Sequence, residues 1–106
     1  VFFDFNESAI KPEGRQTLQK QAAWLQRYTN VTVTVEGHCD DRGTREYNLA
    51  LGARRANAAK QALVALGIAA NRIQTISYGK ERPAVDGHDE TAWAQNRRGV
   101  TVPNVQ

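Results

Sequence analysis

Residues 37–56, GHCDDRGTREYNLALGARRA, place two adjacent carboxylates and two adjacent guanidinium groups within a short part of the chain. Asp40 and Asp41 stand in a loop bounded by glycines, and Arg54 and Arg55 follow in a segment with the apolar spacing of a helix. Such groups can transfer protons, hold a metal ion or bind a ligand of opposite charge. Which of these they do depends on which side chains the fold turns toward one another.

The segment after this loop predicts a helix over about 44–66, with a cap at Thr44 and a natural stop at Gly67. At about 100° per residue, Arg54 falls on the polar side of this helix and Arg55 falls inside its apolar arc. The sequence therefore predicts that Arg55 faces the core. The apolar arc is made by Leu51, Ala59, Ala62, Leu63 and Leu66.

An inward-facing arginine keeps its proton, so Arg55 needs a partner or a route to water. Its stem could lie on the core edge while its head reaches solvent, or it could form a structural ion pair with Asp40 or Asp41. A third arrangement of Arg55 is possible, because the strand predicted over 31–37 places Asp40 just past its carboxyl end, beside the start of the helix. Asp40 and Arg55 would then face each other across a shallow pocket. Such a pair matches a ligand that carries both an ammonium and a carboxylate.

The elements that must position these residues alternate along the chain. Period-two patterns predict strands, and apolar residues at i, i+4 and i+7 predict helices. The resulting order, β-α-β-α-β-α-β, predicts an α/β two-layer sandwich in which a four-stranded mixed sheet has helices on one face. The predicted strands are 1–6, 31–37, 72–79 and 98–102, and the predicted helices are 12–28, 44–66 and 91–96.

Composition limits the class of protein. The 106 residues fit a single domain over 1–106, with 41% hydrophobic and 24% charged residues. No apolar run approaches the ~18 residues that cross a bilayer. The 14 basic residues are interleaved with 11 acidic ones, which argues only weakly for a polyanionic partner. The chain opens abruptly on a strand-like run, so we expect a domain excised from a longer precursor whose lipid anchor or linker lies upstream.

The stretch EGHCDDRGTREYNLALGARRANA resembles the OmpA-like peptidoglycan-binding domain family, whose pattern is GHxDxxGxxxxNxxLxxxRAxxV. The later stretch SYGKERPAVDGHDETAWAQNRRGV is similar to one branch of that family, the Pal lipoproteins of the Tol-Pal system. The resemblance implies noncovalent binding of the meso-diaminopimelate of peptidoglycan stem peptides, in the periplasm of a Gram-negative bacterium. It further implies a tether between outer membrane and cell wall, with TolB and other Tol proteins as partners and without cofactor or catalysis.

The resemblance also implies which residues hold the ligand. In the family, the aspartate of GHxD and the arginine of RA bind the free end of the amino acid, and these positions are Asp40 and Arg55 here. This chain has Asn6 where Pal relatives usually carry aspartate, and Cys39 where GHxD usually has a small residue. The remaining pocket positions implied by the family are Phe5, Asn6, Asn48 and Leu51.

Catalysis and metal binding fit the same residues poorly. His38, Cys39, Asp40 and Asp41 are consecutive, so their side chains point in different directions, and the spacings of zinc sites are absent. Adjacent aspartates seldom flank one scissile bond at the ~5 to 10 Å that glycosidases require. We therefore expect no metal, no catalytic residue and a structural hydrogen bond for His38.

Other binding functions remain open at this point. The strands carry valine and threonine where an RNA-binding sheet would present stacking aromatics, so we expect no nucleic acid partner. The resemblance implies that Arg97 or Arg98 ties the end of the chain to the central loop. Within the same fold, the chain could come from a porin or a flagellar stator, and a protein-interaction module for TolB is a further alternative.

Overall fold

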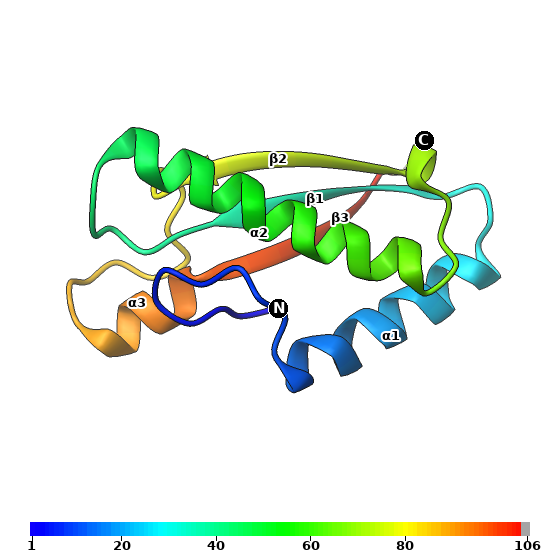
Figure 1. The fold of residues 1–106 in the computed structure, drawn as a ribbon, viewed down its shortest axis with the longest axis horizontal. Coiled ribbons are helices and arrows are strands. Elements are labelled where there is room, and N and C mark those ends of the chain that lie inside the picture. The colour runs from blue at the N-terminus through cyan, green and yellow to red at the C-terminus, as the bar shows by residue number, and fades with distance from the viewer. Residues whose placement is uncertain (105–106) are drawn as a thin grey trace.

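The structure, a computed structural model, describes residues 1–104. Figure 1 shows the two long helices lying together on one side of a small sheet. In the sheet, β1 (Thr32–His38) lies between β2 (Ile73–Gly79), to which it is parallel, and β3 (Arg98–Asn104), to which it is antiparallel. The elements are α1 (Pro12–Arg27), β1 (Thr32–His38), α2 (Arg45–Ala65), the 3-10 turn η1 (Ala70–Arg72), β2 (Ile73–Gly79), α3 (Glu90–Asn96) and β3 (Arg98–Asn104).

The core lies between the sheet and the two long helices. Val33 and Val35 of β1 are buried, whereas the alternate residues Thr34 and Glu36 are half-buried, as the period-two pattern predicts. The buried side chains of both helices join these valines in one apolar cluster. This cluster confirms a layered α/β fold. It contains Leu18, Ala22, Leu25, Val33, Val35, Ala56, Ala59, Leu63, Ile68 and Ile73.

Two glycines bring α2 unusually close to the sheet. A β-carbon at Gly37 would lie 1.7 Å from the carbonyl oxygen of Gly52, and one at Gly52 would lie 2.2 Å from Oγ of Ser77. Only glycine fits at this crossing. The close approach holds the first turns of α2 beside the carboxyl end of β1, where the predicted pocket residues lie.

The helix boundaries follow their local signals. Thr44 caps α2 by accepting a hydrogen bond from the backbone nitrogen of Tyr47 at 3.1 Å, and Gly67 follows its end with φ of +99°. The predicted helices over 12–28, 44–66 and 91–96 are therefore confirmed to within two residues at each end. Across residues 1–104, none of the helices combines the length and the apolar character needed to cross a bilayer.

The prediction of a fourth strand over residues 1–6 is wrong. Within residues 1–104 the sheet has three strands, and the N-terminal segment meets the start of β3 in an isolated bridge between Phe2 and Arg98 rather than as a strand. Phe3 donates its backbone N–H to the carbonyl oxygen of Arg97 at 2.9 Å. Beyond Phe3 the segment leaves the sheet.

A turn at Phe5 and Asn6 explains this departure. Asn6 has φ of +57°, a left-handed conformation that asparagine tolerates better than most residues. Phe3 is buried, but Phe5 is 47% exposed, so the predicted alternation fails at Phe5. The turn brings Phe5 to the loop that follows β1, where Cζ of Arg42 lies 3.7 Å from the centroid of its ring.

Candidate functional site

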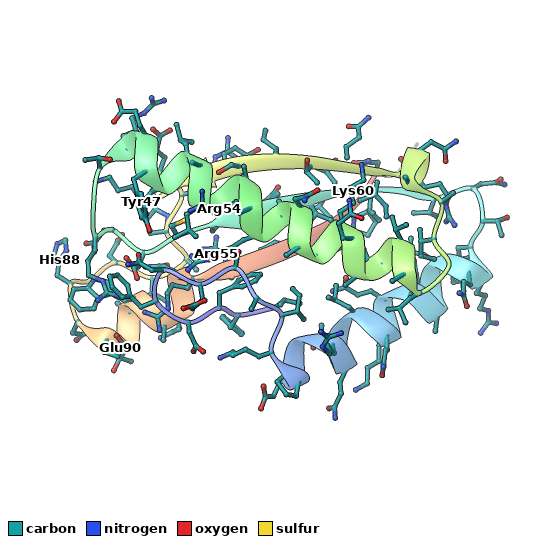
Figure 2. The ribbon with its side chains drawn as sticks, in the orientation of Figure 1. Tyr47, Arg54, Arg55, Lys60, His88 and Glu90 are labelled. Carbon is teal, nitrogen blue, oxygen red and sulfur yellow. The ribbon has the colours of Figure 1, made fainter. Side chains whose placement is uncertain are left out.

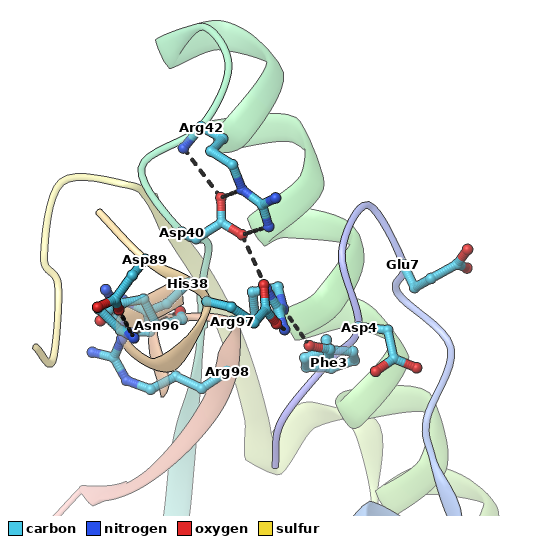
Figure 3. A network of polar contacts seen from close by, with 12 residues as sticks. Phe3, Asp4, Glu7, His38, Asp40, Arg42, Asp89, Asn96, Arg97 and Arg98 are labelled. Atoms are coloured by element: carbon cyan, nitrogen blue, oxygen red, sulfur yellow. Dashed lines mark hydrogen bonds and ion pairs between the residues drawn. The ribbon is translucent and has the colours of Figure 1, made fainter. Parts of the chain in front are cut away.

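Asp40 lies just past β1 and is almost fully buried. Its Oδ2 accepts hydrogen bonds from Nη2 of Arg42 at 2.8 Å and from Nη1 of Arg97 at 3.4 Å, as Figure 3 shows. Its Oδ1 accepts from the backbone nitrogen of Arg42 at 3.1 Å and from Nε at 3.3 Å. Burial favours the neutral acid, but the bonds and charges of Arg42 and the bond from Arg97 outweigh it and lower the pKa of Asp40. Asp40 is therefore an ionised carboxylate.

Arg97 is the tie that the family resemblance led us to expect at Arg97 or Arg98. Besides Asp40, it donates from Nε to the carbonyl oxygen of Phe3 at 2.8 Å and from Nη2 to Glu90 at 2.7 Å. The expectation is confirmed for Arg97, whereas Arg98 donates to the carbonyl oxygens of Arg82 and Asn96.

Arg55 faces inward, and its side chain is 1% exposed. It donates from Nε to the carbonyl oxygen of Glu7 at 2.8 Å, from Nη1 to that of His38 at 3.0 Å and from Nη2 to that of Asp4 at 3.0 Å. Figure 2 shows Arg54 on the outer side of α2 and Arg55 toward the N-terminal segment. The wheel prediction for both arginines is confirmed.

These contacts rule out both simpler explanations for Arg55. Its head does not reach solvent, and within residues 1–104 the ion pairs of Asp40 are with Arg42 and Arg97, not with Arg55. Three carbonyl oxygens supply the polar environment instead. Burial lowers the pKa of Arg55, and the nearby Cys39 and Asp40 partly offset this, but an arginine stays protonated in a protein.

The structure brings all the predicted pocket residues to one small cavity. Asp40 and Arg55 both line it without bonding to each other. The centre of a water molecule can move through only about 10 Å³ of this cavity, which is room for about one water. Arg42, whose guanidinium is bound to Asp40, forms part of the cavity wall. The lining residues are Phe5, Asn6, Cys39, Asp40, Arg42, Asn48, Leu51 and Arg55.

Asn48 holds the loop that carries Asp40. Its Nδ2 donates to the carbonyl oxygens of Arg42 at 2.7 Å and Thr44 at 2.9 Å. Cys39 is buried, its Sγ donates to the carbonyl oxygen of Asn48 at 3.2 Å, and burial raises the pKa of its thiol. A thiol in this environment is a packing group rather than a nucleophile.

His38 makes the structural contact that the sequence predicts. Its Nε2 lies 3.1 Å from Oε1 of Glu36, and its ring stacks on Tyr78 with centroids 5.4 Å apart. Burial lowers the pKa of His38, and the hydrogen bond to Glu36 partly opposes this shift. In the part of the chain that the structure describes, His, Cys, Asp and Glu form no group of three or more that could hold a metal ion.

The sequence reasoning missed Arg42 and Trp93. Arg42 forms a bidentate pair with Asp40, and its Cζ lies 4.1 Å from the ring centroid of Trp93. One signal for Arg42 was available, because an aspartate in a loop often bonds the backbone nitrogen two residues later. No such signal exists for Trp93, which comes from the distant helix α3.

The chain belongs to the OmpA family, whose family model matches residues 2–97. The chain is 57% identical over 102 residues to the peptidoglycan-associated lipoprotein of Agrobacterium fabrum, covering 96% of this chain and 58% of the relative. The crystal structure of the peptidoglycan-associated lipoprotein from Burkholderia pseudomallei is similar with a TM-score of 0.95 and 41% identity, covering 98% of this chain and 88% of that chain.

A second solved structure shares only the fold. The C-terminal domain of Helicobacter pylori MotB has a TM-score of 0.90 at 21% identity, covering 99% of this chain and 83% of that chain. The chain spans 58% and 62% of the length of the curated relatives from Agrobacterium fabrum and Brucella melitensis. These relatives and the Burkholderia protein share the name peptidoglycan-associated lipoprotein.

Proposed function

We propose that this chain binds peptidoglycan noncovalently, by holding the free end of meso-diaminopimelate in the stem peptide. The observation that supports this most directly is a buried carboxylate and a buried guanidinium that line one cavity without pairing with each other. In this proposal Asp40 receives the ammonium and Arg55 receives the carboxylate. Recognition alone accounts for the function, and the chain is a binding module rather than an enzyme.

The donors of Arg55 are compatible with this role. A guanidinium has five N–H groups. Three of those of Arg55 are used on backbone carbonyls, which fix its plane, and the others remain for a ligand carboxylate. Charge-assisted bonds of this kind are about twice as strong as neutral ones.

The other lining residues have smaller roles in the proposal. Leu51 and Phe5 contact the methylene groups of the ligand, and Asn6 adds a hydrogen bond. Asn48 uses its amide N–H groups on the loop, so only its side-chain oxygen is left to accept a hydrogen bond from the ligand.

The relatives support a proposal for the cellular role. By analogy with the lipoproteins that share its sequence, we propose that the domain works in the periplasm and tethers the outer membrane to the cell wall through an upstream lipid anchor. TolB and other Tol proteins are the proposed protein partners. The high identity to these lipoproteins favours this role over that of a stator or porin domain, since the MotB likeness extends only to the fold.

Titration of purified muropeptides tests the proposal. A stem peptide with meso-diaminopimelate should bind about ten- to a hundredfold more tightly than one with lysine, because the lysine peptide lacks the carboxylate that pairs with Arg55. The bond between that carboxylate and the guanidinium contributes about 1.5–3 kcal/mol to binding. Asp40→Asn should abolish this binding. Asp41→Asn is the matched control, because Asp41 contacts His88 outside the cavity. Equal affinity for the two peptides would contradict the proposal.

A further inference from the structure

Arg42 binds the carboxylate oxygens of Asp40 to which the ammonium of the ligand would bind in the proposed function. Its Nε and Nη2 form a fork on the two carboxylate oxygens, at 3.3 and 2.8 Å (Figure 3). Its Cζ also lies over two aromatic rings, 3.7 Å from the centroid of Phe5 and 4.1 Å from that of Trp93. A carboxylate and two aromatic faces are the groups that proteins use to bind an organic cation. We call this set of Asp40, Phe5 and Trp93 the cation slot.

Of the two arginines on Asp40, Arg42 is the one that can leave. The side chain of Arg42 is 30% exposed, whereas that of Arg97 is 7% exposed. Arg97 is also fixed by Phe3 and Glu90, and it would keep the carboxylate oriented after Arg42 had moved. The loop would keep its shape, because two of its bonds use only the backbone of Arg42, one from its nitrogen to Asp40 and one to its carbonyl oxygen from Asn48.

The cavity has no room for a whole amino-acid head group while Arg42 stays in place. Its free space is about 10 Å³ for the centre of a water molecule, and Arg42 forms part of its wall. Because the fork of Arg42 occupies both carboxylate oxygens, the ammonium of the ligand can take its place on Asp40 only after the guanidinium has moved away. The guanidinium is a cation of the same charge, so the exchange keeps Asp40 paired and the charge of the slot unchanged.

We propose that Arg42 fills the cation slot in the free protein and that the ammonium of the ligand displaces it. This inference rests on the function proposed above and adds a residue that sets affinity and selectivity. A ligand without an ammonium would leave Asp40 buried with one partner fewer, so the exchange selects for a cation. The apparent affinity is the affinity of the open slot multiplied by the fraction of molecules in which Arg42 has moved away. If the slot is open in one molecule in ten, Arg42 weakens binding about tenfold.

Three arginine variants test the displacement by calorimetric titration with a meso-diaminopimelate tripeptide. Arg42→Ala should bind about tenfold more tightly than the wild type. Arg42→Gln keeps a polar side chain at this position but loses the charged fork, so it should also bind more tightly. Arg45→Ala is the matched control, because Arg45 follows the same loop but pairs with Glu81 away from the cavity, and its affinity should not change.

A second measurement tests the slot itself. Methylguanidinium should bind to Arg42→Ala and restore the weaker affinity for the tripeptide, but it should leave the wild type unaffected. Its binding should change the fluorescence of Trp93, read in a Trp24→Phe background because Trp24 is on the distant helix α1. Failure of methylguanidinium to compete in Arg42→Ala would overturn the cation slot.

The outcomes separate the two proposals. If the wild type binds the tripeptide and both Arg42 variants bind it equally or more weakly, the displacement is wrong and the proposed function stands. If none of the proteins binds it, both are wrong. Tighter binding by the Arg42 variants, with an unchanged Arg45→Ala, supports both.

Discussion

Replacement of Arg55 should destabilise the fold as well as the site. Its guanidinium ties α2 to the N-terminal turn and to the end of β1, by bonds to the carbonyl oxygens of Asp4, Glu7 and His38. Arg55→Ala leaves these acceptors without their charged donor and empties a fully buried volume. A bond to a charged group is worth about 1.5–3 kcal/mol, and because coupled losses are not additive we expect about 4 kcal/mol for the three. Arg55→Lys retains the charge but cannot reach all three acceptors, so it should lose about 2–3 kcal/mol.

Urea unfolding followed by tryptophan fluorescence measures these losses. Arg54→Ala is the matched control, because Arg54 is exposed on the opposite side of α2, and it should change stability by less than about 0.5 kcal/mol. Binding is then compared under conditions where every variant is folded, and Arg55→Ala should abolish it while Arg54→Ala barely changes it. An Arg55→Ala protein as stable as the wild type, or a larger effect at Arg54, would refute the account of Arg55.

Three further changes have defined outcomes. Gly37→Ala should cost about 3 kcal/mol in urea unfolding, because the new β-carbon would meet the carbonyl oxygen of Gly52; no loss would show that the helix is not held that closely. Burial lowers the pKa of His38 below 6.5, so its contribution to stability is complete above pH 6.5 and is lost as the pH falls through the lowered pKa. His38→Gln should weaken the dependence of the unfolding free energy on pH in this range, and an unchanged pH dependence would contradict this account of His38. The pKa of Asp40 is lowered from 3.8, so affinity for the ligand should persist to about pH 4. A loss of ligand affinity in calorimetric titrations at pH 5 would contradict this.

The sequence predicts the helices and the central strand well because their signals are local. The cap at Thr44, the stop at Gly67 and the apolar arc of α2 lie within one segment, so the inward direction of Arg55 follows from spacing alone. The family pattern, together with this spacing, predicts the six pocket residues, and the structure gathers them at one cavity. Their roles toward a ligand remain predictions.

The errors lie where distant segments meet. Residues 1–6 alternate like a strand, but the left-handed conformation of Asn6 turns the chain away, and alternation alone does not show such a turn. The partners of Arg55 were expected to be a carboxylate or water, whereas three backbone carbonyls supply them. Backbone acceptors carry no signature in the sequence. The role of Arg42 likewise depends on Phe5 and Trp93, which only the folded chain brings together.

A crystal structure of the complex with a meso-diaminopimelate tripeptide tests the central claim most directly. The account predicts the ammonium of the ligand at the carboxylate of Asp40, its carboxylate on the remaining N–H groups of Arg55, and the Arg42 side chain turned out of the cavity. A ligand bound elsewhere on the surface, or bound here with its carboxylate away from Arg55, would contradict it.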